Sequence, residues 1–105
     1  MLENLTIEML GNRGSDAKPV VIDFSAEWCG PCKLFAPIFK RVAAAYEDRV
    51  DFATVDVDAQ PELTTHFDVS NFPSILAIKD GEVVYRSTGI LNEPSLKAVI
   101  ENLLG

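Results

Sequence analysis

The sequence predicts an α/β fold in which a mixed sheet of about four strands carries helices on both faces. Residues 19–25 form a near-continuous apolar run, the pattern of a strand that is covered on both sides. Residues 50–57 give a second strand after a long helix, so these two strands should be parallel in a right-handed crossover. An Asp-Gly pair, a strong hairpin signal, separates residues 74–79 from residues 83–87, which should therefore be antiparallel.

Three helices are expected around these strands. The helix after the first strand has one apolar face at helical spacing, formed by Phe35, Ile38, Phe39, Val42 and Tyr46. Residues 61–67 predict a short helix. The last helix follows Asn92, a candidate N-cap, and Pro94, and its apolar stripe is expected to cover the sheet. This stripe consists of Leu96, Val99, Ile100, Leu103 and Leu104.

Length and composition indicate a single domain over residues 1–105. At 48% hydrophobic and 24% charged residues, the chain has enough apolar sequence for a two-layer core. Residues 1–4 lack the features of a secretory signal and no apolar stretch reaches spanning length, so we expect a cytoplasmic protein. The net charge of −7 argues against nucleic acid or an anionic membrane as a partner.

Both cysteines lie in one Cys-x-x-Cys turn directly after the first strand. The spacing lets the sulfur atoms of Cys29 and Cys32 form a disulfide, and at the start of a helix a Cys29 thiolate is favoured by unpaired N–H groups. Gly30 permits a tight turn, and Pro31 suits a first helical turn. Because structural disulfides are rare in a reducing compartment, this pair is expected to be redox-active.

Two other interpretations of the cysteines are weaker. Zinc needs about four ligands, and His66 is the only other soft ligand in the chain, so no metal is expected. Two inert core thiols fit poorly with a Gly-Pro turn between them. His66 itself lies alone in a short polar helix, and we expect it to be solvated rather than to transfer protons.

One motif and several shorter stretches match a known family. The motif is Trp28-Cys29-Gly30-Pro31-Cys32-Lys33. The shorter stretches are Val21-Ile22-Asp23-Phe24, Ala26-Glu27, Ala36-Pro37, Asn71-Phe72-Pro73, Asp80-Gly81-Glu82 and Gly89. On these residues the chain resembles thioredoxins from about residue 20 to its C-terminus, and only the first eighteen residues do not fit.

The resemblance implies a thioredoxin-like fold and a general protein disulfide reductase, an oxidoreductase that carries electrons in cell redox homeostasis. Cys29 would attack a client disulfide as a thiolate, and Cys32 would resolve the mixed disulfide. The Gly30-Pro31 pair matches reducing members of the family. The sequence contains no Gly-rich phosphate loop, so no bound cofactor is expected. The electrons would come from a thioredoxin reductase, an NADPH-dependent flavoprotein.

Asp23 is a carboxylate inside an otherwise apolar strand, where burial is costly unless the group stays protonated. One interpretation leaves it at a solvated pleat edge, because carboxylates avoid full burial. In thioredoxins the matching Asp lies behind the disulfide and handles the proton of the second cysteine. The resemblance therefore makes Asp23 the general acid/base for Cys32. Thioredoxins commonly pair this Asp with a Lys, and the matching position here is Thr54.

A patch for docking clients is expected around the cysteines, formed by Trp28, Gly30, Pro31, Phe72, Pro73, Gly89 and Ile90. The resemblance makes Pro73 a cis proline, beside which a bound segment can pair as an added strand. Trp28 is expected at the rim, although a place in the core is the alternative. Phe72 stands where thioredoxins usually have an aliphatic residue, and would make the patch more aromatic.

The N-terminal segment is expected to lack the first strand of the family, because too few residues precede Pro19 for both a strand and a helix. Apolar residues at helical spacing favour one short helix, and residues 11–15 then form a loop too short for a parallel crossover. The residues of this predicted helix stripe are Leu2, Leu5, Met9 and Leu10. A competing interpretation makes residues 5–10 a strand, since Leu5, Ile7 and Met9 alternate.

Without that first strand, residues 50–57 would become an edge of the sheet. Such an edge needs protection, here by charges such as Asp51, Asp56 and Asp58 or by self-association. We otherwise expect a monomer that acts on disulfide-containing client proteins. Two other functions stay open: a binding module whose thiols are incidental, and a reductase dedicated to one client pathway, which Thr54 and Phe72 favour.

Overall fold

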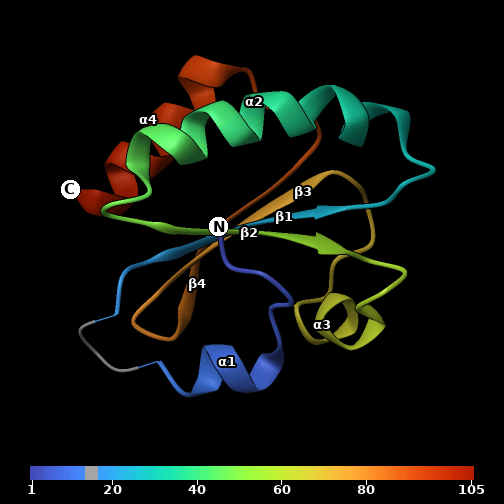
Figure 1. Cartoon of the computed structure of the whole chain (residues 1–105), viewed down its shortest axis with the longest axis horizontal. Helices are drawn as coiled ribbons and strands as arrows, with labels where there is room; N and C mark the ends of the chain where they lie inside the picture. The colour runs from blue at the N-terminus through green and yellow to red at the C-terminus, as the bar shows by residue number, and fades with distance from the viewer. Residues whose placement is uncertain (14–16) are drawn as a thin grey trace.

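The computed structural model describes residues 1–13 and 17–105, and these residues contain four strands in one mixed sheet (Figure 1). The elements in chain order are α1 (Ile7–Gly11), β1 (Val20–Ser25), α2 (Gly30–Tyr46), β2 (Asp51–Asp56), α3 (Pro61–His66), β3 (Ser74–Lys79), β4 (Glu82–Thr88) and α4 (Glu93–Leu104). The strand order is β2-β1-β3-β4, with β1 and β2 parallel and the other neighbours antiparallel. This arrangement confirms the predicted sheet, and every strand begins and ends within one residue of its expected bounds.

Two helical layers enclose the sheet. Figure 1 shows α2 and α4 on one face and α1 and α3 on the other. Alternate residues of β1 are buried in two separate clusters: Ile22 and Phe24 pack with Leu63 of α3, whereas Val21 packs with the α2 and α4 side chains. Because side chains alternate along a strand, Asp23 points to the same face as Val21, toward α2.

Most of the predicted apolar face of each long helix is buried, whereas Ile38, Val99 and Leu104 are half-buried. On α2 the buried residues of the predicted face are Phe35, Phe39, Val42 and Tyr46, and on α4 they are Leu96, Ile100 and Leu103. The side chain of Asn92 caps α4 by accepting the N–H of Ser95 at 2.9 Å, which confirms its predicted role. Within the described residues, no helix combines the length and apolar character needed to cross a membrane.

The N-terminal helix is shorter than its predicted stripe. It begins at Ile7 because Thr6 is the N-cap, with Oγ1 accepting the N–H of Met9 at 3.1 Å. Leu2 and Leu5 precede the helix, so the prediction that both belong to it is wrong; Leu5 instead anchors the segment in the core at 3% exposure. The competing strand over residues 5–10 is also wrong, since residues 7–11 are helical. The predicted loop at residues 11–15 lies partly outside the described residues.

Strand β2 is an edge of the sheet, as the missing first strand requires. One contact covers part of it: Leu2 forms a single parallel bridge with Ala53 and donates its N–H to the carbonyl of Phe52 at 2.7 Å. The φ angle of Asn4, +53°, then turns the chain away from an extended course, so pairing stops after one residue. The edge is therefore protected by backbone pairing as well as by charge, which the sequence analysis did not expect.

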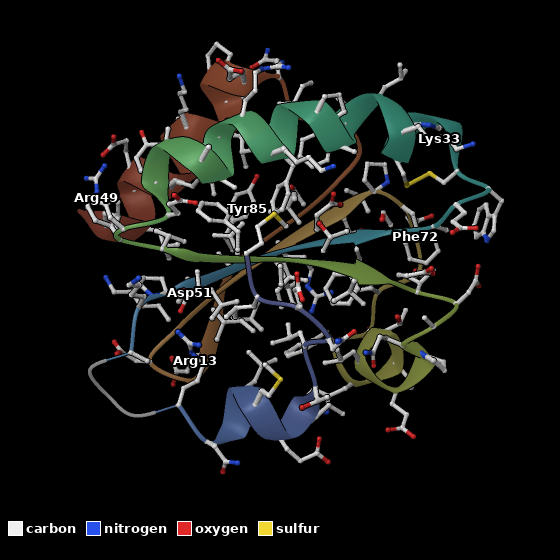
Figure 2. All side chains as sticks on the ribbon, in the orientation of Figure 1. Arg13, Lys33, Arg49, Asp51, Phe72 and Tyr85 are labelled. Atoms are coloured by element: carbon white, nitrogen blue, oxygen red, sulfur yellow. A yellow bond between two sulfur atoms is a disulfide. The ribbon has the colours of Figure 1, made fainter. Side chains whose placement is uncertain are left out.

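Arg13 holds the start of this edge. Its Nη2 atom lies 2.6 Å from Oδ2 of Asp51 and also donates to the carbonyl of Lys18 at 2.8 Å. Figure 2 shows Arg13 and Asp51 pointing toward one another across the gap between the N-terminal segment and β2. The sequence predicts that the charge of Asp51 protects this edge. In the structure that charge is paired with Arg13 in a partly buried ion pair.

Amide hydrogen exchange should separate the two sides of β2. The N–H groups of Asp51 and Val57 donate to β1 and its flanking residues at 2.9 Å, so alternate amides face β1 and should be strongly protected. The amides of Phe52 and Asp56 face the outer edge and should exchange faster. Strong protection of both in a monomer would show that another segment completes the sheet, and would contradict the missing strand.

Candidate functional site

The two cysteines form a disulfide at the start of α2. Cys29 is the N-cap residue, and its Sγ accepts the N–H of Cys32 at 3.2 Å. Both residues are nearly buried, with Cys29 the more exposed at 6% against 3%. After reduction, this N–H and the positive end of the helix would stabilise a thiolate on Cys29. The structure thus places the pair where the sequence analysis expected it.

The segment before β3 brings a backbone carbonyl next to the Cys29 sulfur. The peptide bond between Phe72 and Pro73 is cis, as the resemblance implied. The carbonyl oxygen of Phe72 lies 3.7 Å from Sγ of Cys29, and that of Pro73 accepts the N–H of Gly89 at 2.8 Å. Figure 2 shows Phe72 at the same end of the molecule as the disulfide and Lys33. The segment of Phe72 and Pro73 therefore links Cys29 on one side to Gly89 on the other.

Trp28 lies at the rim of this site, and the alternative place in the core is wrong. Its side chain is 67% exposed, while its ring packs edge-to-face on Phe72 with centroids 5.9 Å apart. Its Nε1–H donates to Oδ2 of Asp58 at 2.8 Å. The sequence analysis assigned Asp58 to edge protection and missed this contact, because nothing in the spacing of the two residues indicates that they meet.

The other residues of the expected patch differ in exposure. Gly30, Pro31, Gly89 and Ile90 are exposed, whereas Pro73 is buried. Gly89 has a φ angle of +93°, a conformation that glycine adopts without strain. A glycine therefore suits this position, where the N–H donates to the carbonyl of Pro73.

Leu34 is an exposed apolar residue that the sequence analysis left out. Its side chain is 69% exposed, and it lies one helical turn after Gly30 on α2. Residues four apart share a helix face, so Leu34 extends the exposed surface that begins at Gly30. The available signal was its position outside the buried face of a helix that starts at the cysteines.

The side chain of Asp23 is buried on the face of the sheet that α2 covers. It is 1% exposed, and its Oδ1 atom has no hydrogen-bond partner among the described residues. Burial raises the pKa of this carboxyl from 3.8 to about 7. The interpretation of a solvated pleat edge is therefore wrong. Its neighbour on β2 is Thr54, which is exposed and brings no positive charge to the carboxyl.

His66 is exposed at the end of α3, where its ring packs edge-on against Phe67 with centroids 4.7 Å apart. This position agrees with the expectation of a solvated residue. Within residues 1–13 and 17–105, no group of three or more His, Cys, Asp or Glu side chains is arranged to hold a metal ion.

Comparison with known proteins identifies the family. The thioredoxin family model matches residues 8–102, so the expectation that the first eighteen residues do not fit the family is wrong for residues 8–18. The chain is 42% identical over 87 residues to a mitochondrial thioredoxin of Mus musculus, which covers 83% of this chain and 52% of that protein. It is also 42% identical over 96 residues to a putative thioredoxin 2 of Streptomyces coelicolor, covering 91% and 71% of the two chains. The residues matched by the family model include the cysteine motif and all four strands.

A solved structure supports the same conclusion. The thioredoxin of Malassezia sympodialis aligns with a TM-score of 0.75 and 35% identity over 81% of this chain and 74% of that one. The chain therefore belongs to the thioredoxin family. It spans about half the length of the mammalian mitochondrial relatives that it matches.

The burial of Asp23 should make stability depend on pH. Its folded-state pKa of about 7 exceeds the ordinary 3.8, so ionisation opposes folding. The cost is absent below about pH 4, grows as the pH rises through this window, and is complete above about pH 7 at about 4 kcal/mol. Asp23→Asn cannot ionise, and in urea unfolding of the disulfide form it should match the parent near pH 4 and exceed it by about that amount near pH 8.5.

The matched control for this comparison is Asp48→Asn, which removes the same charge from an exposed position. It should change stability little at either pH. An equal gain for Asp23→Asn at both pH values would show that the carboxyl does not ionise with a raised pKa.

Proposed function

We propose that this protein is a protein-disulfide oxidoreductase that works as a general protein disulfide reductase. The observation that carries the proposal is the disulfide between Cys29 and Cys32 at the N-terminus of α2, in a chain of the thioredoxin family. The site also has an exposed apolar rim, formed by Trp28 and Leu34, on which an unfolded or extended client can rest.

Cys29 is the nucleophile of the reducing reaction. In the dithiol form its thiolate attacks one sulfur of a client disulfide, so that a bond from Cys29 to the client forms as the client disulfide breaks. The first client thiolate leaves and takes up a proton. Cys32 then attacks Cys29, restores the Cys29–Cys32 disulfide and releases the second client thiol. Two electrons have then passed from the protein to the client. Cys32 gives up one of the two protons that the client takes up, and solvent, which received the Cys29 proton when the thiolate formed, supplies the other.

Asp23 accepts the proton of Cys32 in the second step. Three features support this role: it faces α2, it is shielded from water, and its pKa of about 7 lets it gain or lose a proton near neutral pH. The unpaired Oδ1 atom leaves one acceptor site available to a thiol or a water molecule.

The cycle closes when a reductase returns two electrons to the Cys29–Cys32 disulfide. We assign this step to a thioredoxin reductase, an NADPH-dependent flavoprotein, since the chain carries two sulfur atoms as its redox groups and no phosphate-binding loop. The remaining elements of the proposal are client proteins with disulfides, a monomeric carrier and a cytoplasmic location. The charge of −7 disfavours anionic partners such as nucleic acid or acidic lipid.

The two cysteines should have unequal roles. Cys29→Ser should abolish reduction of a generic protein disulfide, whereas Cys32→Ser should still attack and accumulate covalent mixed disulfides, because only resolution is lost. Non-reducing electrophoresis and mass spectrometry of the trapped adduct measure this difference. Trapping by Cys29→Ser alone would reverse the assignment. A parent protein that reduces no disulfide would favour a binding module with incidental thiols.

Asp23→Asn should slow reduction near neutral pH by about tenfold or more and remove one ionisation from the pH–rate profile. The ionisation that disappears should be that of the Asp23 carboxyl, whose pKa is about 7. Thr54→Lys places a cation on the neighbouring strand and should move the same ionisation to lower pH, whereas the control Thr54→Ser should leave it in place. An unchanged profile in Asp23→Asn would show that Asp23 is only structural.

A further inference from the structure

Trp28 combines high exposure with two contacts that fix its ring. Its side chain is 67% exposed, yet the Nε1–H donates to Asp58 at 2.8 Å and the ring lies edge-to-face on Phe72 at an interplanar angle of 76°. An exposed side chain without such contacts samples several rotamers. The indole is therefore held in one orientation while it still presents most of its surface to solvent.

Asp58 is itself fixed by the turn that follows β2. Its N–H donates to Oδ1 of Asp56 at 2.9 Å, and the carbonyl of Asp56 accepts the N–H of Gln60 at 2.8 Å. A side chain that accepts the N–H two residues on is the Asx turn, which restricts the backbone around it. The acceptor for Trp28 thus belongs to a structured turn at the end of a strand.

The other side of Trp28 leads to the reacting sulfur. Phe72, against which the indole packs, places its carbonyl oxygen 3.7 Å from Sγ of Cys29. The next residue, Pro73, is buried and linked to Gly89 by a backbone hydrogen bond of 2.8 Å. A chain of contacts therefore runs from Asp58 through Trp28 and Phe72 to Cys29.

We propose that Asp58 is a positioning residue for disulfide exchange: it holds Trp28 against Phe72, so that an aromatic wall stands beside Cys29 before a client binds. This inference rests on the proposed function and names its client chemistry. Two aromatic rings in edge-to-face contact offer a large, rigid apolar surface. The client that fits is an extended segment with a large apolar side chain next to its disulfide.

The effect of Asp58 should appear in binding rather than in chemistry. Asp58 has no recorded contact with the sulfur atoms. Its hydrogen bond restricts Trp28 already in the free protein, so less side-chain entropy is lost when a client docks. Loss of the hydrogen bond should raise the client concentration for half-maximal rate by about three- to tenfold and leave the limiting rate unchanged.

Single-turnover reduction by the pre-reduced protein tests this split. Two peptides are used, each with one intramolecular disulfide, which differ only in having Leu or Gly beside a cysteine. Asp58→Ala should raise the half-saturating concentration of the Leu peptide by about three- to tenfold and that of the Gly peptide by less than about twofold. Asp58→Asn keeps an oxygen acceptor without the charge and should restore most of the loss.

Trp28 supplies an independent readout because it is the only tryptophan in the chain. Its time-resolved fluorescence anisotropy should show faster local motion in Asp58→Ala than in the parent or in Asp58→Asn. The control is Asp48→Ala, which removes an exposed carboxylate beyond the far end of α2, about 25 Å of helix from Cys29. It should alter neither the anisotropy nor the kinetics.

Several outcomes would overturn the role of Asp58. These are an unchanged anisotropy in Asp58→Ala, an equal change for both peptides, a fall in the limiting rate alone, or an Asp58→Asn variant that behaves like Asp58→Ala. A parent protein that reduces neither peptide would overturn the proposed function itself. The two failures are therefore distinguishable.

Discussion

The burial of β1 on both faces is the constraint on which the rest of the structure depends. The strand pairs with β2 on one side and β3 on the other, and five of its six residues are buried. Its end at Ser25 fixes where the chain leaves the sheet, and α2 begins only five residues later with Cys29 as its N-cap. The cysteine pair therefore follows directly from a buried strand that is paired on both sides, which suits chemistry that needs accurately placed atoms.

The same strand carries a buried carboxyl, that of Asp23, whose charge is disfavoured by burial. Asp23 lies between apolar neighbours, and its Oδ1 atom has no hydrogen-bond partner in the part of the chain that the structure describes. Its raised pKa of about 7 reflects how strongly burial disfavours its charge. Thr54, its exposed neighbour, does not offset this with a cation. A strand chosen for stability alone would have an aliphatic residue here. A carboxyl with a raised pKa on the face toward α2 is consistent with the proton transfer proposed for Asp23.

Regular elements could be predicted from the sequence because their signals are local. The apolar run of β1, the Asp-Gly turn between β3 and β4 and the Asn92 cap depend on residues that are neighbours in the chain. Contacts between distant segments carry no such signal. Leu5 fits a helical spacing but packs in the core before α1 begins, and Asp58 meets Trp28 through two turns that only the folded sheet brings together. The spacing of Cys29 and Cys32 predicted their disulfide, and the resemblance to thioredoxins implied the cis Pro73, but neither indicated the hydrogen bond between Trp28 and Asp58.

The departure at the N-terminus lies away from the site. In the described residues, the ion pair of Arg13 with Asp51 stands at the start of β2, whereas Asp58 follows its end, and Figure 2 shows Arg13 and Asp51 at the opposite end of the molecule from Phe72 and Lys33. Functional side chains in such sheets gather at the carboxyl ends of parallel strands. The N-terminal segment thus covers part of one sheet edge, while β1, β2 and the turns after them define the geometry around Cys29.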